Sequence, residues 1–158
     1  RGMSYPNGSC NDEIVGLLPG LGIEYCRTVG STDSFGMPEN YLKWTATCHH
    51  NHNLLENGQK FVELFKAQYL YMMYVWGHSF EFTRDNNWEL IEEFCQLVGN
   101  REDIWYATNI EIVDYMKAAK NLKFTIDADK VYNPGFDSVW INVDGMIVEV
   151  PGGKTVNI

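Results

Sequence analysis

The stretch Tyr69-Leu-Tyr-Met-Met-Tyr-Val-Trp-Gly-His-Ser-Phe-Glu-Phe82 decides the fold, because a hydrophobic run meets a glycine and a histidine there. Every residue from Leu70 to Trp76 is apolar or aromatic, which predicts a strand buried on both faces, as in a parallel sheet covered by helices. Gly77 lets the backbone turn before His78. Ligands bind at the carboxyl ends of the strands in such sheets, so His78 is a candidate catalytic residue. A core histidine that ends a strand is the alternative.

Helix and strand patterns alternate on both sides of this run. Before it, we expect a helix over 12–18, a strand over 22–29, a strand over 41–47 and a helical stripe over 54–65. After it come an amphipathic helix over 85–98, a strand over 103–107 and a helix capped by Thr108. The alternation of helices and strands, joined by short links, predicts an α/β fold with a parallel sheet or a barrel built from βα units.

The pattern changes after residue 120. Short strands are expected over 123–127, 130–132, 138–143, 146–150 and 155–158, with a hairpin turn at Asp144-Gly145. We therefore divide the chain into an α/β part, residues 1–120, and a small antiparallel β extension, residues 121–158. The extension has no histidine, so we expect it to serve packing or to shape the substrate side of the site rather than to take part in catalysis.

Composition narrows the possible partners. The chain has 158 residues and a net charge of −9, which argues against nucleic acid, because phosphate binding needs clustered basic residues. No apolar run approaches the roughly 20 residues of a membrane helix. The four cysteines are widely spaced, which favours free thiols in a reducing cytoplasm, and we expect a cytoplasmic location.

Two polar groups are candidates for chemistry beside His78. Glu81 follows His78 by three residues and can orient its imidazole, or it is an exposed acid on a loop. His49, His50 and His52 fall within four residues, so they can bind a metal. Against this, neighbouring residues on an extended chain point to opposite faces, which leaves a solvated or substrate-facing loop as the alternative. We assign no metal ligand in this chain.

Aromatic side chains and one cysteine have two interpretations each. Trp76, Phe80, Phe82 and Trp88 can form a stacking platform for sugar rings, or they belong to the core. Cys48 is adjacent to His49 and is a weak candidate nucleophile for a metal-independent hydrolase.

Several short sequence motifs resemble those of the polysaccharide deacetylases of carbohydrate esterase family four, which have the NodB-type fold. Tyr5-Pro6-Asn7-Gly8, followed by a helix and Gly22-Ile-Glu-Tyr-Cys-Arg-Thr-Val29, is similar to the family's Y-P-Y-G … G-x-x-Y-A-R-T stretch. Trp76-Gly77-His78 resembles its late strand-histidine motif. The segment 103–112, the T-C-H-H of Thr47–His50 and the Y-N-P of Tyr132–Pro134 resemble a deacetylase-like subgroup.

The resemblance implies a TIM-barrel-like distorted (β/α) barrel that removes N- or O-acetyl groups from carbohydrate polymers or oligosaccharides. In the family, one Asp and two His hold a divalent metal such as zinc, and a late histidine protonates the leaving group. His78 matches that acid. Asn7 matches the residue whose backbone N–H steadies the oxyanion. Tyr5, Pro6, Trp76 and Glu81 are then the expected substrate-binding residues.

The chain also departs from the family. Ser4 stands where many members have an arginine, and neither the Asp-Asp motif nor the His-x-x-x-His metal motif is present in the 158 residues. We therefore expect a truncated, inactive C-terminal portion of such a barrel, with the metal held only in the full-length protein. Open barrel edges would favour self-association. A non-catalytic carbohydrate-binding or scaffolding domain is the alternative function.

Overall fold

The chain folds as two compact units. The computed structural model describes residues 1–65 and 69–158. The first unit spans Arg1–Tyr106 and the second Ala107–Ile158. We expected the division after residue 120, but helix α5 (Asn109–Lys120) packs on strand β7 (Val139–Val143) and belongs to the second unit. Within the described ranges, no helix has the length and apolar character needed to cross a membrane.

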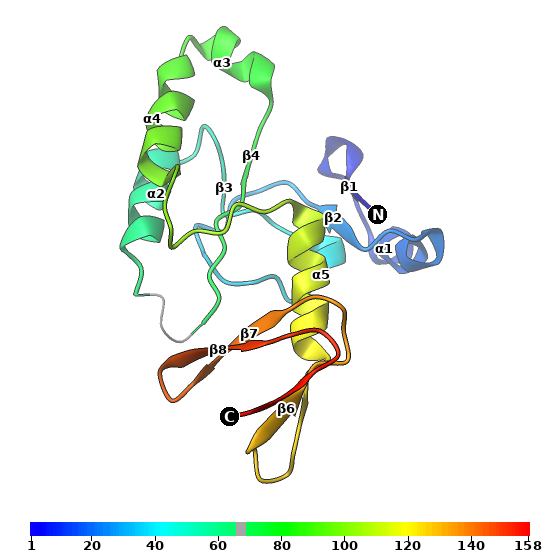
Figure 1. Cartoon of the computed structure of the whole chain (residues 1–158). Helices are drawn as coiled ribbons and strands as arrows, with labels where there is room; N and C mark the ends of the chain where they lie inside the picture. The colour runs from blue at the N-terminus through cyan, green and yellow to red at the C-terminus, as the bar shows by residue number, and fades with distance from the viewer. Residues whose placement is uncertain (66–68) are drawn as a thin grey trace. The chain divides into compact units, whose positions relative to one another are not determined.

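Parallel strand pairs form the centre of the first unit (Figure 1). Strand β1 (Gly2–Ser4) pairs with β2 (Tyr25–Arg27), and β3 (Cys48–His49) pairs with β4 (Val75–Trp76). Arg27 at the end of β2 also forms a parallel bridge with Trp44, so the segment 44–49 joins the two pairs. The mixed α/β class with parallel pairing is confirmed, although the strands described in residues 1–65 and 69–158 do not close a barrel.

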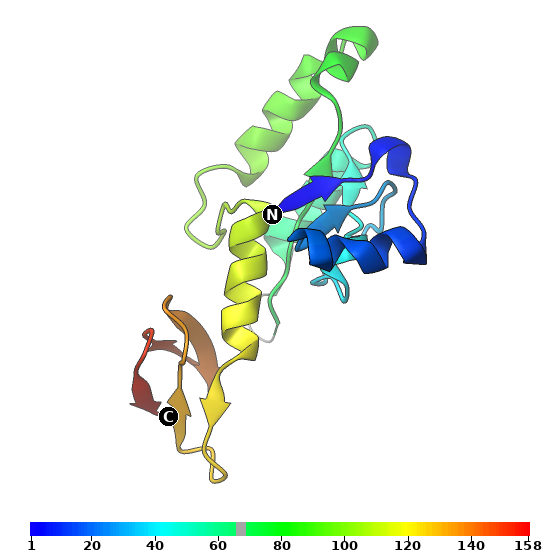
Figure 2. The same cartoon turned by 90° about the vertical axis from the view of Figure 1, so that its right-hand side faces the viewer.

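Within residues 1–65 and 69–106, this unit has four α-helices, namely α1 (Asp12–Leu17), α2 (Leu54–Glu63), α3 (Ser79–Asp85) and α4 (Trp88–Val98). Short 3₁₀ turns lie at Pro6–Gly8, Leu18–Leu21 and Tyr41–Lys43. Apolar side chains from α1, the following turn and the first strand pair form a buried cluster of Tyr5, Val15, Leu18 and Cys26. Helix α4 is labelled in Figure 1 and is the long green helix of Figure 2. Helices α2 and α4 pack against each other. Gly58 on α2 permits this approach, because a Cβ there would lie 3.0 Å from Leu97 Cδ2.

The hydrophobic run is less buried and less regular than its composition predicts. Only Val75 and Trp76 form a strand, and Leu70 is 55% exposed while Met72 is buried. The backbone N–H of Met72 donates to Phe35 O, and that of Tyr74 donates to the Thr47 hydroxyl, so neither enters a ladder. Loop and side-chain acceptors thus replace the expected neighbouring strand.

Three other expectations are corrected. The segment 41–47 begins with a 3₁₀ turn and pairs only at Trp44, and the segment 103–107 forms no strand. The helix expected over 85–98 forms as α4 but begins only at Trp88, because Asn86 adopts a left-handed conformation with φ 48° and ends α3 at Asp85. Helix α2, in contrast, forms over most of the predicted stripe.

The second unit confirms the predicted antiparallel strands. Thr108 caps α5 by accepting from the Glu111 N–H, while Glu111 accepts from the Thr108 N–H. Strands β5 (Lys123–Phe124), β6 (Lys130–Tyr132) and β9 (Thr155–Asn157) form one antiparallel sheet, and β7 pairs with β8 (Met146–Val150) in a hairpin. Asp144 and Gly145 have φ of 50° and 87°, the positive pair that a two-residue I′ turn requires.

Asn133 is the polar centre of this unit. Its side chain is fully buried, and its amide nitrogen donates to Asp137 O at 2.8 Å and to Val150 O at 2.9 Å. Its amide oxygen accepts from the Gly135 N–H at 2.8 Å. The side chain therefore joins the end of β8 to the loop between β6 and β7, and both N–H groups of its amide donate hydrogen bonds.

We predict that Asn133→Asp destabilises the second unit by about 2 to 4 kcal/mol, because a carboxylate would face two carbonyl oxygens without a proton to donate. The measurement is urea unfolding at pH 7, followed through NMR signals of residues 107–158. Asn157→Asp is the matched control, since Asn157 is exposed on β9, and should change stability by less than about 0.5 kcal/mol. Equal effects of the two substitutions would contradict the role of Asn133.

Candidate functional site

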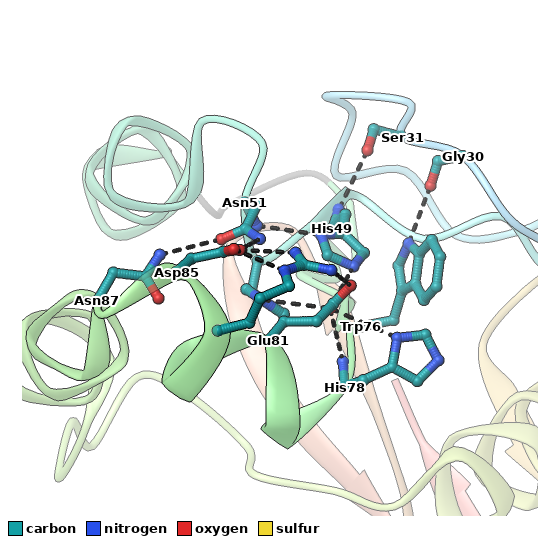
Figure 3. A network of polar contacts seen from close by, with 11 residues as sticks. Gly30, Ser31, His49, Asn51, Trp76, His78, Glu81, Asp85 and Asn87 are labelled. Atoms are coloured by element: carbon teal, nitrogen blue, oxygen red, sulfur yellow. Dashed lines mark hydrogen bonds and ion pairs between the residues drawn. The ribbon is translucent and has the colours of Figure 1, made fainter.

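Polar side chains gather where β3 and β4 end (Figure 3). The parallel register places His49 beside Trp76, so His50 and the Gly77-His78 pair leave the two strands at the same edge. The backbone N–H of His50 donates to Trp76 O at 2.9 Å. Helix α3 begins at Ser79, directly after His78, and brings Glu81 back toward the ends of both strands.

One oxygen of Glu81 contacts three imidazole rings. Glu81 Oε2 lies 3.1 Å from His49 Nε2, 3.5 Å from His50 Nε2 and 3.4 Å from His78 Nδ1. The same oxygen accepts the backbone N–H of His78 at 3.1 Å, which caps the first turn of α3. The predicted link between Glu81 and His78 is thus present, and the structure adds His49 and His50 to it.

His50 is the most constrained member of this cluster. Its side chain is 3% exposed, and its ring stacks on Phe82 with centroids 4.2 Å apart. A Cβ on Gly77 would lie 1.7 Å from His50 Nδ1, so the glycine is needed for space. His50 Nε2 is buried and makes no hydrogen bond within the described part of the chain, although buried polar atoms are normally paired.

Burial and neighbouring polar groups together shift the pKa values of Glu81 and His50. Desolvation by itself would raise the pKa of Glu81, but the hydrogen bond from the His78 backbone N–H and the electrostatic interaction with His49 outweigh it, and the pKa is lowered. Burial lowers the pKa of His50, and the neighbouring His49 lowers it further. A neutral imidazole therefore faces an ionised carboxylate at neutral pH.

The arrangement provides a group of candidate metal ligands. One ligand atom each from His49, His50 and Glu81 lies within 4.8 Å of the other two. From the sequence we assigned no metal ligand here, because side chains alternate along a strand and adjacent histidines would diverge. The strand ends at His49, and His50 already belongs to a turn, so alternation no longer applies.

The loop after β2 adjoins the same edge. Trp76 Nε1 donates to Gly30 O at 3.1 Å, and the His49 N–H donates to Ser31 Oγ at 3.1 Å. The Arg27 guanidinium lies 4.2 Å from the centre of the Trp76 ring. The loop after β2 is therefore attached to the ends of β3 and β4.

The Tyr5-Pro6-Asn7 segment directly follows β1. Tyr5 is 4% exposed and its hydroxyl donates to Leu42 O, so this expected substrate-binding side chain is placed in the core. Burial raises the pKa of Tyr5 to about 12. Pro6 and Asn7 are exposed in a turn whose hydrogen bonds use the N–H groups of Gly8 and Ser9, not that of Asn7.

His52 and Cys48 lie outside the Glu81 cluster. His52 Nε2 contacts Asp33 Oδ2 at 2.9 Å, and buried Asn57 donates to Asp33 Oδ1 at 2.8 Å. Cys48 is fully buried, and desolvation raises the pKa of its thiol, which argues against the nucleophile hypothesis. All four cysteines are free, as expected.

The four candidate stacking aromatics have different environments. Phe82 is buried, Trp76 is half-buried between Arg27 and His49, and Trp88 packs on Phe82 with 48% exposure. Phe80 is 62% exposed and its ring centroid is 5.3 Å from that of His78. Phe80 is thus the accessible apolar ring beside the histidine.

Comparison with models of protein families, with curated proteins and with solved structures found no match.

We predict that Gly77→Ala destabilises the first unit by about 1 to 3 kcal/mol, because the methyl group would overlap His50 in a packed site. Chemical unfolding checks this value. Gly16→Ala on α1 is the control, since nothing lies within 4 Å of the added Cβ, and alanine should raise helix stability by about 0.5 to 1 kcal/mol. If Gly77→Ala leaves the free energy of unfolding unchanged, the His50 ring can move to make room for the methyl group.

The stability of the first unit should depend on pH through the carboxylate of Asp33. Hydrogen bonds from His52 and Asn57 hold the pKa of Asp33 below its ordinary value. A lowered folded-state pKa means that this contribution to stability is present above about pH 4, the unfolded value, and is lost as pH falls through the folded pKa. The ¹³C shift of the Asp33 carboxyl should titrate below that of a free aspartate. In His52→Gln the midpoint should rise, and an unchanged midpoint would exclude His52 as the cause.

Proposed function

We propose that this protein is a polysaccharide deacetylase-like hydrolase, a portion of a distorted (β/α) barrel in which His78 is the acid that protonates the leaving group. The observation that carries the proposal is the position of His78. It directly follows β4, it is 54% exposed, and its Nδ1 lies 3.4 Å from Glu81. A carboxylate on one ring nitrogen orients a histidine and leaves the other nitrogen for proton transfer.

The turn after β1 supports a second part of the site. A Cβ on Gly8 would lie 2.5 Å from Val29 Cγ2, so the Tyr-Pro-Asn-Gly turn packs on the loop that also holds Trp76 through Gly30. This chain of contacts favours Asn7 and His78 as neighbours along one edge of the strands. The Asn7 N–H is then available to stabilise an acyl oxyanion.

The resemblance also implies a divalent metal in the complete site. Its Asp-Asp and His-x-x-x-His motifs are not among the 158 residues, whereas His49, His50 and Glu81 form a donor set of two imidazoles and one carboxylate, which suits zinc. A metal in such a site polarises the acyl oxygen and lowers the pKa of a bound water. Because the family's own metal motifs are not among these residues, we expect the 158-residue chain without added metal to bind the acetylated sugar without turnover.

The alternative is a carbohydrate-binding module without catalysis. The exposed Phe80 ring beside His78 favours it, because sugar rings stack on aromatic faces. The two functions differ in what they recognise. A deacetylase site must contact the acetyl group, whereas a stacking platform recognises the sugar ring.

We predict that penta-N-acetylchitopentaose binds the chain and shifts the NMR signals of the His78 imidazole and the Asn7 amide. Cellopentaose is the matched control, because it has the same linkage and no charge but carries a hydroxyl in place of each acetamide. If the site recognises the acetyl group, cellopentaose should leave the NMR signals of the His78 imidazole and the Asn7 amide unchanged. Phe80→Ala should weaken binding of the acetylated sugar by about tenfold, from the loss of one stacking contact.

Equal binding of the two sugars would favour the non-catalytic module. Absence of binding, or shifts confined to residues 107–158, would overturn both functions. If the chain with added Zn²⁺ does release acetate, His78→Gln should lower kcat by about 10²- to 10⁴-fold, with a smaller effect on KM. Retained kcat in that variant would remove His78 as the acid.

A further inference from the structure

The cluster around Glu81 has the spacing of a metal site. Ligand nitrogens about 2.0 to 2.1 Å from a tetrahedral zinc lie about 3.3 Å from each other. His49 Nε2 and His50 Nε2 lie 3.1 and 3.5 Å from Glu81 Oε2, and the three ligand atoms fall within 4.8 Å of one another. A small inward adjustment of the side chains would complete such a set.

The unpaired nitrogen of His50 points to a ligand. Its side chain is 97% buried, as a 3% exposed fraction shows, yet Nε2 has no hydrogen-bond partner in residues 1–65 and 69–158. Its nearest charged neighbour is Glu81 Oε2, which lies at the limit of hydrogen-bond distance. A cation between the two atoms would satisfy both.

The surrounding contacts hold these donors in place. The His50 ring stacks on Phe82, and the His49 ring packs edge-on against Trp76 with centroids 4.5 Å apart. Arg84 lies 3.8 Å from the other carboxylate oxygen, Oε1, and its charge is balanced by two bonds to Asp85. The hydrogen bond from the His78 backbone N–H holds Glu81 with Oε2 toward the two histidines.

His49 must change its protonated nitrogen when a metal binds. Its Nδ1 accepts the Asn51 N–H at 3.1 Å, so the proton of the neutral ring is on Nε2. A metal on Nε2 requires that proton to move to Nδ1, which breaks the bond from Asn51. No proton is lost from His49 in this step, and the Asn51 amide becomes a specific reporter.

We propose that His49, His50 and Glu81 bind a divalent transition-metal ion such as Zn²⁺, through the two Nε2 atoms and one carboxylate oxygen. The side chains of His49 and Glu81 are 20% and 13% exposed, which gives the ion a path from solvent. His78, whose Nδ1 lies 3.4 Å from the same oxygen, or a water fills the fourth position. The site stands whether or not the protein acts on carbohydrate.

The test is a titration of the untagged, chelator-treated chain with Zn²⁺ in competition with a chromophoric chelator, and with Co²⁺ by visible absorption. We expect one ion per chain and a tetrahedral cobalt spectrum. His49→Gln and Glu81→Gln should each weaken Zn²⁺ binding by more than about tenfold. His52→Gln is the matched control, because His52 pairs with Asp33 outside the cluster, and should leave the affinity unchanged.

A second measurement needs no substitution and so does not depend on the folding of a variant. In ¹⁵N NMR of the original chain, Zn²⁺ should move the Nε2 signals of His49 and His50 and shift the Asn51 amide. Absence of one-to-one binding, or affinity unaffected by Glu81→Gln and His49→Gln, would overturn the site. Sugar binding without Zn²⁺ binding would refute only this metal site. Zn²⁺ binding without sugar binding would refute only the proposed function.

Discussion

A single carboxylate oxygen, Glu81 Oε2, connects the parts of the candidate site. It accepts the N–H that begins α3, and it lies within 3.5 Å of an imidazole nitrogen from each of His49, His50 and His78. Because Glu81 is the third residue of the helix, the capping requirement places its carboxylate at the helix start. The same local rule that starts α3 therefore brings a negative charge to the ends of β3 and β4.

The absence of a side chain at Gly77 allows this arrangement. Parallel pairing sets His50 against the backbone that follows Trp76, and a Cβ at residue 77 would overlap the His50 ring. His50 can then stack on Phe82 from α3, which lies one residue beyond Glu81. Sheet pairing, helix capping and core packing thus converge on the same few atoms, so a change in one of them alters the other two.

Sequence analysis could identify the elements whose signals are local. The cap at Thr108, the turn at Asp144-Gly145 and the Glu81–His78 spacing each depend on residues three or fewer positions apart. The irregular path of the run from Leu70 was not predictable, because composition does not reveal that Phe35 and Thr47 accept the N–H groups of Met72 and Tyr74. The meeting of His49 and His50 was also missed, since it depends on the strand ending between them.

The two lone pairs of Glu81 Oε2 limit what the site can do at one time. One lone pair is used by the His78 backbone N–H, so a bound cation would take the other. The His78 imidazole would then lose the carboxylate as its orienting partner and become either a metal ligand or a free acid facing solvent. The capping bond would remain, because it uses the backbone and not the ring. Metal occupancy and the orientation of His78 would therefore be coupled through one atom, and the acid role that we propose for His78 would depend on the state of the histidine pair beside it.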